Sequence, residues 1–172
     1  MVTGGSKGMG RAAALTFAAE GARVAVLARG RTALDATVAA LGAAGSPDAI
    51  GIAADLTDRD QVDAAFAEIR DRFRVCNVLV NAAGPVDVGI RRFEDLDDAE
   101  WMATFDIGTL SAARAVRAAL PLLRAADWAR IVTLSAARSI GESEGHPGCG
   151  RSRRDQSSRR DDVDRRQLPP TL

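Results

Sequence analysis

The sequence predicts an α/β protein built on a doubly wound sheet of parallel strands, and two observations carry this prediction. Short apolar runs of strand length alternate with segments of helical period about every 20 to 30 residues, which is the pattern of βαβ units with right-handed crossovers. A glycine-rich stretch, TGGSKGMGR, lies directly before the first helical segment, as in folds that hold a phosphate at a helix N-terminus. Together they indicate an incomplete Rossmann-like domain over residues 1–140.

The first four segments after the glycine-rich stretch are each identified by their own pattern. Alanine and leucine at helical spacing predict a helix over residues 9–20 that ends at Gly21. Residues 22–30, ARVAVLARG, are short and apolar at their centre, as expected of a buried parallel strand. Residues 31–45 have a helical period and end in glycines, and residues 49–55, AIGIAAD, predict a second short strand.

The second half of the domain continues the alternation. We expect a helix, a strand, a longer helix and a strand at residues 55–73, 75–84, 101–126 and 129–136. The first of these helices begins after Asp58, whose carboxylate can accept hydrogen bonds from the free amides of the first turn. The longer helix contains Pro121, which predicts a kink or a late break because proline has no N–H to donate.

Both ends of the chain depart from a complete domain of this kind. Only Met1 and Val2 precede the glycine-rich stretch, so we expect a truncated central strand and exposed hydrogen-bonding edges inside the sheet. Residues 141–172 contain scarcely any apolar residues and have neither a helical nor a strand period. Such a segment cannot bury enough surface to offset its ordering entropy, so we expect an irregular, disordered tail.

Composition and charge exclude several classes of function. The 23 basic residues balance the 23 acidic ones, so no overall field favours a nucleic acid or an anionic membrane, and we expect neither as a partner. Cys76 and Cys149 form no CxxC pair, which argues against a zinc site or a disulfide framework, and we expect no metal. The sequence shows no spanning apolar run and no signal-peptide pattern, which favours a cytoplasmic protein.

The glycine-rich stretch is the main candidate binding site. Its glycines have the spacing TGxxxGxG ahead of a helix, where glycine permits a tight turn and a close approach of the backbone to the pyrophosphate of a dinucleotide. The residues expected to contact this pyrophosphate are Gly4, Ser6, Lys7, Gly8, Met9 and Gly10. A Walker A loop is excluded because no GK[ST] follows. A methyltransferase loop stays an alternative, although the two preceding residues cannot supply its usual acidic residue.

Taken with three later motifs, this loop resembles the short-chain dehydrogenase/reductase (SDR) family. TGGSKGMGRA is similar to the cofactor loop of that family, and Asp55-Leu56-Thr57 to its acidic residue that contacts adenine. NAAG at residues 81–84 resembles its NNAG turn, and RIVTLSA at residues 130–136 resembles the strand that delivers its catalytic serine. The resemblance covers residues 1–139 in order and spacing. It implies a second group of cofactor contacts, namely Asp55, Leu56, Asn81, Ala82 and Gly84.

The residue type at the end of the second strand bears on the choice of cofactor. An acidic residue there binds the ribose 2′-hydroxyl of NAD, whereas a basic residue accommodates the 2′-phosphate of NADP. This strand ends in Arg29, with Arg31 and Lys7 close by and no carboxylate, so we expect NADP rather than NAD as the cofactor. Alternatively, Arg29 caps the exposed edge of the sheet and is solvated.

Most of the residues that carry catalysis in the SDR family are absent. The resemblance implies a tyrosine and a lysine in a YxxxK motif, a serine that orients the substrate oxygen and an asparagine in the proton path. The chain contains no tyrosine, its single lysine is Lys7, and Gly108 stands at the asparagine position. Ser135, or Ser139 nearby, is the remaining catalytic candidate. An equally supported alternative is that Ser135 is a strand-end serine bonded to nearby backbone.

The function expected from the resemblance is that of an NAD(P)-dependent oxidoreductase of the SDR family. Such an enzyme transfers hydride from NADPH to a carbonyl, or from a secondary alcohol to NADP⁺, and we expect this activity to be impaired here. The alternative is a non-catalytic dinucleotide-binding remnant or pseudoenzyme. A third interpretation lets another group donate the proton, as in dienoyl-CoA reductases. The expected partner is a small-molecule substrate, the family implies a homo-oligomer, and the arginine-rich sequence after Ser139 suggests a shifted reading frame.

Overall fold

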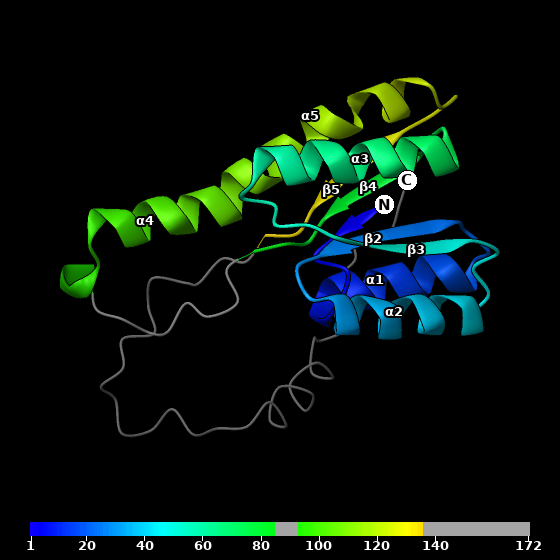
Figure 1. Ribbon diagram of the computed structural model, residues 1–172, viewed down its shortest axis with the longest axis horizontal. Helices are drawn as coiled ribbons and strands as arrows, with labels where there is room; N and C mark the ends of the chain where they lie inside the picture. The colour runs from blue at the N-terminus through cyan, green and yellow to red at the C-terminus, as the bar shows by residue number, and fades with distance from the viewer. Residues whose placement is uncertain (85–92, 136–172) are drawn as a thin grey trace, which may run out of the picture. The chain divides into compact units, whose positions relative to one another are not determined.

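The computed structural model describes residues 1–84 and 93–135, which belong to one compact unit, Met1–Ser135 (Figure 1). Five parallel strands form one sheet in the order β3-β2-β1-β4-β5. The strands are β1 (Val2–Thr3), β2 (Val24–Ala28), β3 (Ala49–Ala53), β4 (Val78–Asn81) and β5 (Arg130–Thr133). The α-helices are α1 (Gly8–Ala19), α2 (Arg31–Ala43), α3 (Arg59–Phe73), α4 (Asp98–Phe105) and α5 (Ser111–Arg124). The predicted doubly wound parallel sheet is confirmed, whereas the boundary at residue 140 and the tail of residues 141–172 lie outside the described residues.

The first strand is short, yet it occupies the centre of the sheet. Its two residues pair with Val26–Leu27 of β2 on one side and with Val80–Asn81 of β4 on the other. The backbone oxygen of Met1 extends this ladder by accepting a hydrogen bond from the Val80 amide at 2.8 Å. The edges of β2 and β4 beside Val2 and Thr3 are paired, and Val24 and Ala25 of β2, upstream of this pairing, are buried. The truncation of the central strand stays a prediction.

Helices lie on both faces of the sheet, as in a doubly wound fold, but the edge strand β5 is exposed along its length. In Figure 1, α1 and α2 lie on one face, and α3 and α5 lie on the other. Successive residues of a strand point to opposite faces, so Val26 joins the core under α1 and α2, whereas Leu27 joins the core under α3 and α5. Leu34 of α2 is fully buried in the first core and Phe66 of α3 is buried in the second.

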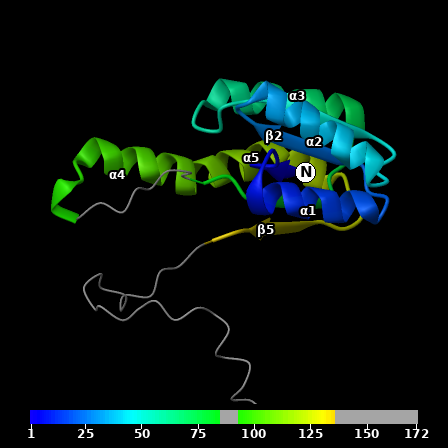
Figure 2. The same ribbon diagram turned by 90° about the horizontal axis from the view of Figure 1, so that it is seen from below.

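The helix expected over residues 101–126 consists of three consecutive segments. It begins with α4, which has a capping box at Asp97, continues through η2 (Asp106–Leu110), a short π-helix, and ends with α5. Figure 2 shows α4 and α5 following one another along one helical path. The irregular stretch contains Gly108 and not Pro121, and α5 continues past the proline to its end. No helix among the described residues is long and apolar enough to cross a membrane.

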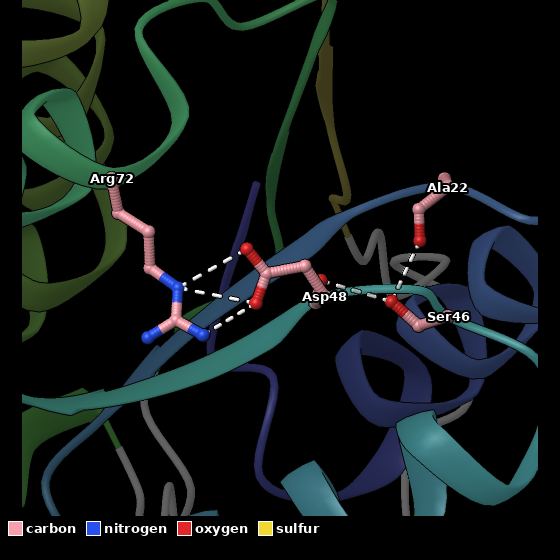
Figure 3. Close-up of polar contacts among 4 residues, drawn as sticks. All are labelled: Ala22, Ser46, Asp48 and Arg72. Atoms are coloured by element: carbon pink, nitrogen blue, oxygen red, sulfur yellow. Dashed lines mark hydrogen bonds and ion pairs between the residues drawn. The ribbon is translucent and has the colours of Figure 1, made fainter.

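Hydrogen bonds and an ion pair hold the residues that precede β3, at the end of the sheet opposite to the glycine-rich loop (Figure 3). The hydroxyl of Ser46 lies 2.7 Å from the carbonyl oxygen of Ala22 and 3.0 Å from that of Asp48. Arg72, near the end of α3, donates through Nε and Nη2 to the Asp48 carboxylate, at 3.1 and 2.5 Å. The bond from Arg72 lowers the pKa of Asp48. Because this ion pair is exposed, it orients the α2–β3 connection more than it stabilises the fold.

The α-amino group of Met1 is buried at the start of the central strand. It donates a hydrogen bond to the carbonyl oxygen of Val78 at 2.7 Å. Burial lowers the pKa of this amine below its usual 8.0 because the charged form is poorly solvated. The thiol of Cys76 lies in the same buried environment, and burial raises its pKa above the usual 9.0. Folding therefore opposes the charged form of both groups.

We predict that the stability of the 172-residue chain with a free Met1 amine is greatest at about pH 8 to 9. Below pH 8 the unfolded chain binds more protons at the amine than the folded chain, so the free energy of unfolding increases as the pH rises toward 8. Above pH 9 the unfolded chain ionises Cys76 more easily, so stability falls again. Urea unfolding between pH 6 and 10 tests this. N-terminal acetylation should remove the rise below pH 8, and a flat profile of the free chain between pH 6 and 8 contradicts the prediction.

Candidate cofactor-binding site

The residues singled out in the sequence gather at one edge of the sheet. All five strands are parallel and their ends are in register, because Thr3 pairs with Leu27 and Asn81, and Asn81 pairs with Thr133. The segments that leave this carboxyl edge contain Gly4–Gly10, Arg29, Asp55, Ala82–Gly84 and Ser135. The strand order reverses between β1 and β4, which is the point where doubly wound folds bind their ligands.

The glycine-rich loop needs glycine at positions that differ in their surroundings. Gly4 has φ +67°, and a Cβ there would lie 2.8 Å from the backbone of Ala82. A Cβ on Gly10 would lie 2.4 Å from the carbonyl oxygen of Gly4. The start of α1 can therefore lie this close to the loop only because Gly10 has no side chain. Gly8 also has a left-handed φ, +55°, but a Cβ there would meet nothing within 4 Å. The loop therefore packs closely against β4 on one side and leaves open space at Gly8 on the other.

The N-terminus of α1 faces this open space with free donors. Lys7 is the N-cap residue, but no side chain caps the helix and its first turn contains no acidic residue. The amides of Gly8, Met9 and Gly10 precede the first intrahelical bond, which Arg11 donates to Lys7 at 3.1 Å. Free amides and the positive end of the helix dipole together favour an anion. Lys7 adds a positive charge, and its side chain is exposed.

The turn after β4 lies against the glycine-rich loop. The amide of Ala82 lies 3.2 Å from the backbone oxygen of Thr3 and 3.3 Å from its Oγ1. Asn81 is only 3% exposed, and its Nδ2 donates to Oγ1 of Thr133 at 3.4 Å. Its Oδ1 is buried without a hydrogen-bond partner among the described residues. The structure thus places the side chain of Asn81 inside the sheet, where it joins β4 to β5, and the backbone at Ala82–Gly84 follows at the carboxyl edge.

The loop after β3 is organised around Asp55. Its Oδ1 accepts hydrogen bonds from the amide and the hydroxyl of Thr57, at 2.9 and 2.7 Å. These bonds, chiefly the one from the amide, lower the pKa of Asp55, with a smaller contribution from the positive charge of Arg29. Arg29 itself is exposed at the end of β2. Leu56 is 4% exposed, and its side chain belongs to the core, so only its backbone can contact a ligand.

Fewer of the expected catalytic residues than of the expected binding residues are present among the described residues. Ser135 is exposed just beyond β5, where the amide of Leu134 still donates to the backbone oxygen of Asn81 at 2.8 Å. Gly108 lies in the π-helical segment η2 and has no side chain to offer. Ser139 lies outside the described residues. Within residues 1–84 and 93–135 no cluster of three His, Cys, Asp or Glu residues could hold a metal ion.

Comparison with known proteins places this geometry in a family. A family model described as short chain dehydrogenase matches residues 1–147, which is most of the chain. The chain belongs to the short-chain dehydrogenase family. The uncharacterised oxidoreductase YvrD of Bacillus subtilis (strain 168) is 34% identical over 140 residues, covering 81% of this chain and 51% of YvrD. The family is one of oxidoreductases that bind a nicotinamide dinucleotide.

Two solved structures share the fold. An actinorhodin polyketide ketoreductase crystallised with NADPH superimposes with a TM-score of 0.70 at 30% identity, covering 77% of this chain and 50% of that one. The NADH-dependent reductase A1-R′, complexed with NAD, gives a TM-score of 0.69 at 27% identity, covering 76% of this chain and 56% of that one. The chain therefore spans about half the length of the short-chain dehydrogenases it matches.

Several residues that shape the site were not identified from the sequence. Thr37 of α2 is fully buried and donates to the carbonyl oxygen of Ser6 at 3.4 Å, which ties the glycine-rich loop to a neighbouring helix. Thr3 and Thr133 hold the turn after β4 from the strands on either side. A threonine in these positions carries no local signal, because its role depends on a partner that is distant in the sequence.

We predict that Gly10→Ala destabilises the fold, because its Cβ would meet the Gly4 carbonyl oxygen at 2.4 Å and the loop would have to shift. Overpacking of this kind costs about 1 to 3 kcal/mol. The matched control is Gly42→Ala in α2, where a Cβ meets nothing within 4 Å, and alanine should stabilise the helix by about 0.5 to 1 kcal/mol. Urea unfolding of both variants measures this, and equal effects of the two substitutions would contradict the account of the loop.

Proposed function

We propose that this chain binds NADP(H) at the carboxyl edge of the sheet, where the strand order reverses between β1 and β4. The observation that carries the proposal is the combination of close-packed Gly4 and Gly10 with the uncapped start of α1 at the point where the strand order reverses. The amides of Gly8, Met9 and Gly10 and the residues Ser6 and Lys7 would hold the pyrophosphate. Asp55, the backbone of Leu56 and the turn from Asn81 through Ala82 to Gly84 would border the adenosine and the ring end of the cofactor.

The preference for NADP over NAD rests on the charges at the end of β2. The family and its solved members support a nicotinamide dinucleotide of either kind, since one neighbour holds NADPH and another holds NAD. Arg29 and Lys7 are exposed and positively charged at this edge, so a 2′-phosphate would meet attractive charge. Arg31 contributes less, because its Nε lies 3.1 Å from the carboxylate of Asp35.

Hydride transfer by this chain is proposed to be impaired. The bound cofactor would supply or accept the hydride, and the exchange with a carbonyl or secondary alcohol also needs a group that moves the hydroxyl proton near neutral pH. Ser135 can orient a substrate oxygen, but an unassisted serine hydroxyl is a poor proton donor at that pH. The 172-residue sequence contains no tyrosine, and its one lysine lies in the glycine-rich loop. The substrate class is a small carbonyl compound or alcohol, and a homo-oligomer is proposed by analogy with the family.

A second candidate function is non-catalytic binding of the dinucleotide. The residue content of the chain favours this function. The residues proposed to hold the cofactor are present, whereas the sequence has no tyrosine, no lysine outside the glycine-rich loop, and Gly108 in place of the asparagine of the family. In that case the chain would bind and release NADP(H) without turnover, and the binding itself would be its function.

We predict that NADPH binds and is not measurably oxidised. Titration of NADPH fluorescence with the chain should give a saturable change, and NADPH absorbance should stay constant with a panel of ketones and aldehydes. Turnover at the rate of a typical enzyme, roughly 1 to 1,000 per second, would refute the impairment and support the oxidoreductase. Absence of any fluorescence change with either NADPH or NADH would remove the binding proposal itself.

We predict that Arg29→Ala weakens NADPH binding by about tenfold, the value of one charge-assisted contact, and leaves NADH binding unchanged. The control is Arg124→Ala, which removes an exposed arginine from the last turn of α5. Dissociation constants for the two cofactors at two salt concentrations measure the effect. If Arg29→Ala weakens NADPH and NADH equally, Arg29 caps the sheet and does not select the 2′-phosphate.

A further inference from the structure

The side chain of Arg114, on α5, contacts the loop that follows β3. Nη1 of Arg114 lies 2.5 Å from Oδ1 of Asp106 and 3.4 Å from the carbonyl oxygen of Leu56. Arg114 and Leu56 are 58 positions apart in the sequence, so this contact joins two distant parts of the fold. The side chains of Arg114 and Asp106 are only 21% and 30% exposed, which makes their ion pair less screened than one on the open surface.

The contact with Leu56 acts on a single peptide unit. The carbonyl oxygen of that unit belongs to Leu56 and accepts from Arg114. Its N–H belongs to Thr57 and donates to Oδ1 of Asp55 at 2.9 Å. Because a peptide unit is planar and trans, holding the direction of the carbonyl also holds the direction of the N–H on the opposite edge. Arg114 therefore influences the Asp55 carboxylate without touching it.

The other anchors of this loop come from the helix that follows it. The side chain of Gln61 accepts from the amide of Asp55 at 3.0 Å and donates to the carboxylate of Asp58 at 2.8 Å. Asp58 in turn caps α3 by accepting from the amides of Asp60 and Gln61. Arg114 adds an anchor from α5, so the loop is fixed between two helices and the Leu56–Thr57 peptide is held at both of its polar groups.

We propose that Arg114 is a positioning residue for the cofactor. It holds the Leu56–Thr57 peptide, and through it the Asp55 carboxylate, in the orientation that receives the adenine ring. The ion pair with Asp106 keeps the guanidinium in place for this task. The inference rests on the proposed binding of NADP(H), and it adds a residue on α5 to a site otherwise built from segments that follow the strands.

Half-cofactor ligands test this role. The variants are Arg114→Met, Arg114→Lys and the control Arg117→Met, which removes an exposed arginine from the same helix. Arg114→Met should weaken NADPH and adenosine 2′-monophosphate by the same factor, about fivefold, and should leave reduced nicotinamide mononucleotide unchanged. Arg114→Lys should restore part of the affinity, and Arg117→Met should match the parent chain. Unchanged affinities, or equal losses for the two half-ligands, would overturn the proposal.

A second readout needs no cofactor. Carbon-13 NMR titration of the Asp55 carboxyl in the free chain should show that Arg114→Met raises the pKa of Asp55, because the Thr57 amide loses its fixed direction. Asp106→Asn should shift the pKa in the same direction by less, and it replaces Arg114→Met if that variant does not fold. An unchanged Asp55 pKa would overturn the positioning role. A raised pKa in a chain that binds no NADPH would keep that role and refute the proposed function instead.

Discussion

The pairing of Val2 and Thr3 with strands on both sides is the constraint on which the whole site depends. These two residues separate β2 from β4, and the strand order reverses beside them. The hydroxyl of Thr3 also lies 3.3 Å from the Ala82 amide and 3.5 Å from the Val80 carbonyl oxygen. The glycine-rich loop and the turn after β4 therefore leave the sheet side by side, in close contact at Gly4 and Ala82.

The described residues include more of the groups needed to bind the cofactor than of the groups needed for proton transfer. The glycine-rich loop has free amides and positive charge, and Asp55 is held in place by hydrogen bonds from Thr57. Proton transfer, by contrast, would depend on Ser135, which is exposed at the last described position of the chain. A backbone cradle depends on local geometry and on glycine, whereas a proton donor needs a particular side chain. For this reason we propose that this chain binds the cofactor and that its turnover is impaired.

The sequence predicted the features that depend on local patterns and missed those that join distant residues. The strands, the helices and the Asp58 cap follow from spacing and residue type. The glycines were expected to approach a phosphate, and the packing of Gly4 and Gly10 against protein backbone was not predicted. The pairing of β1 on both sides was not predicted, because it depends on partners more than twenty residues away. The π-helical segment at Gly108 and the contact between Arg114 and Leu56 gave no sequence signal. Asn81 was expected as a cofactor contact because of its motif, and this stays a prediction; the burial of its side chain within the sheet was not predicted.

The most direct test of the central claim is to map amide chemical shifts of the nitrogen-15 labelled chain as NADPH is added. The account predicts the largest changes at the amides of Gly8, Met9 and Gly10, with smaller changes at Asp55–Thr57 and Ala82–Gly84. Residues on the outer faces of α3 and α5 should not respond. Saturable shifts that leave Gly8, Met9 and Gly10 unmoved, or that cluster between α3 and α5, would show that the glycine-rich loop does not hold the cofactor.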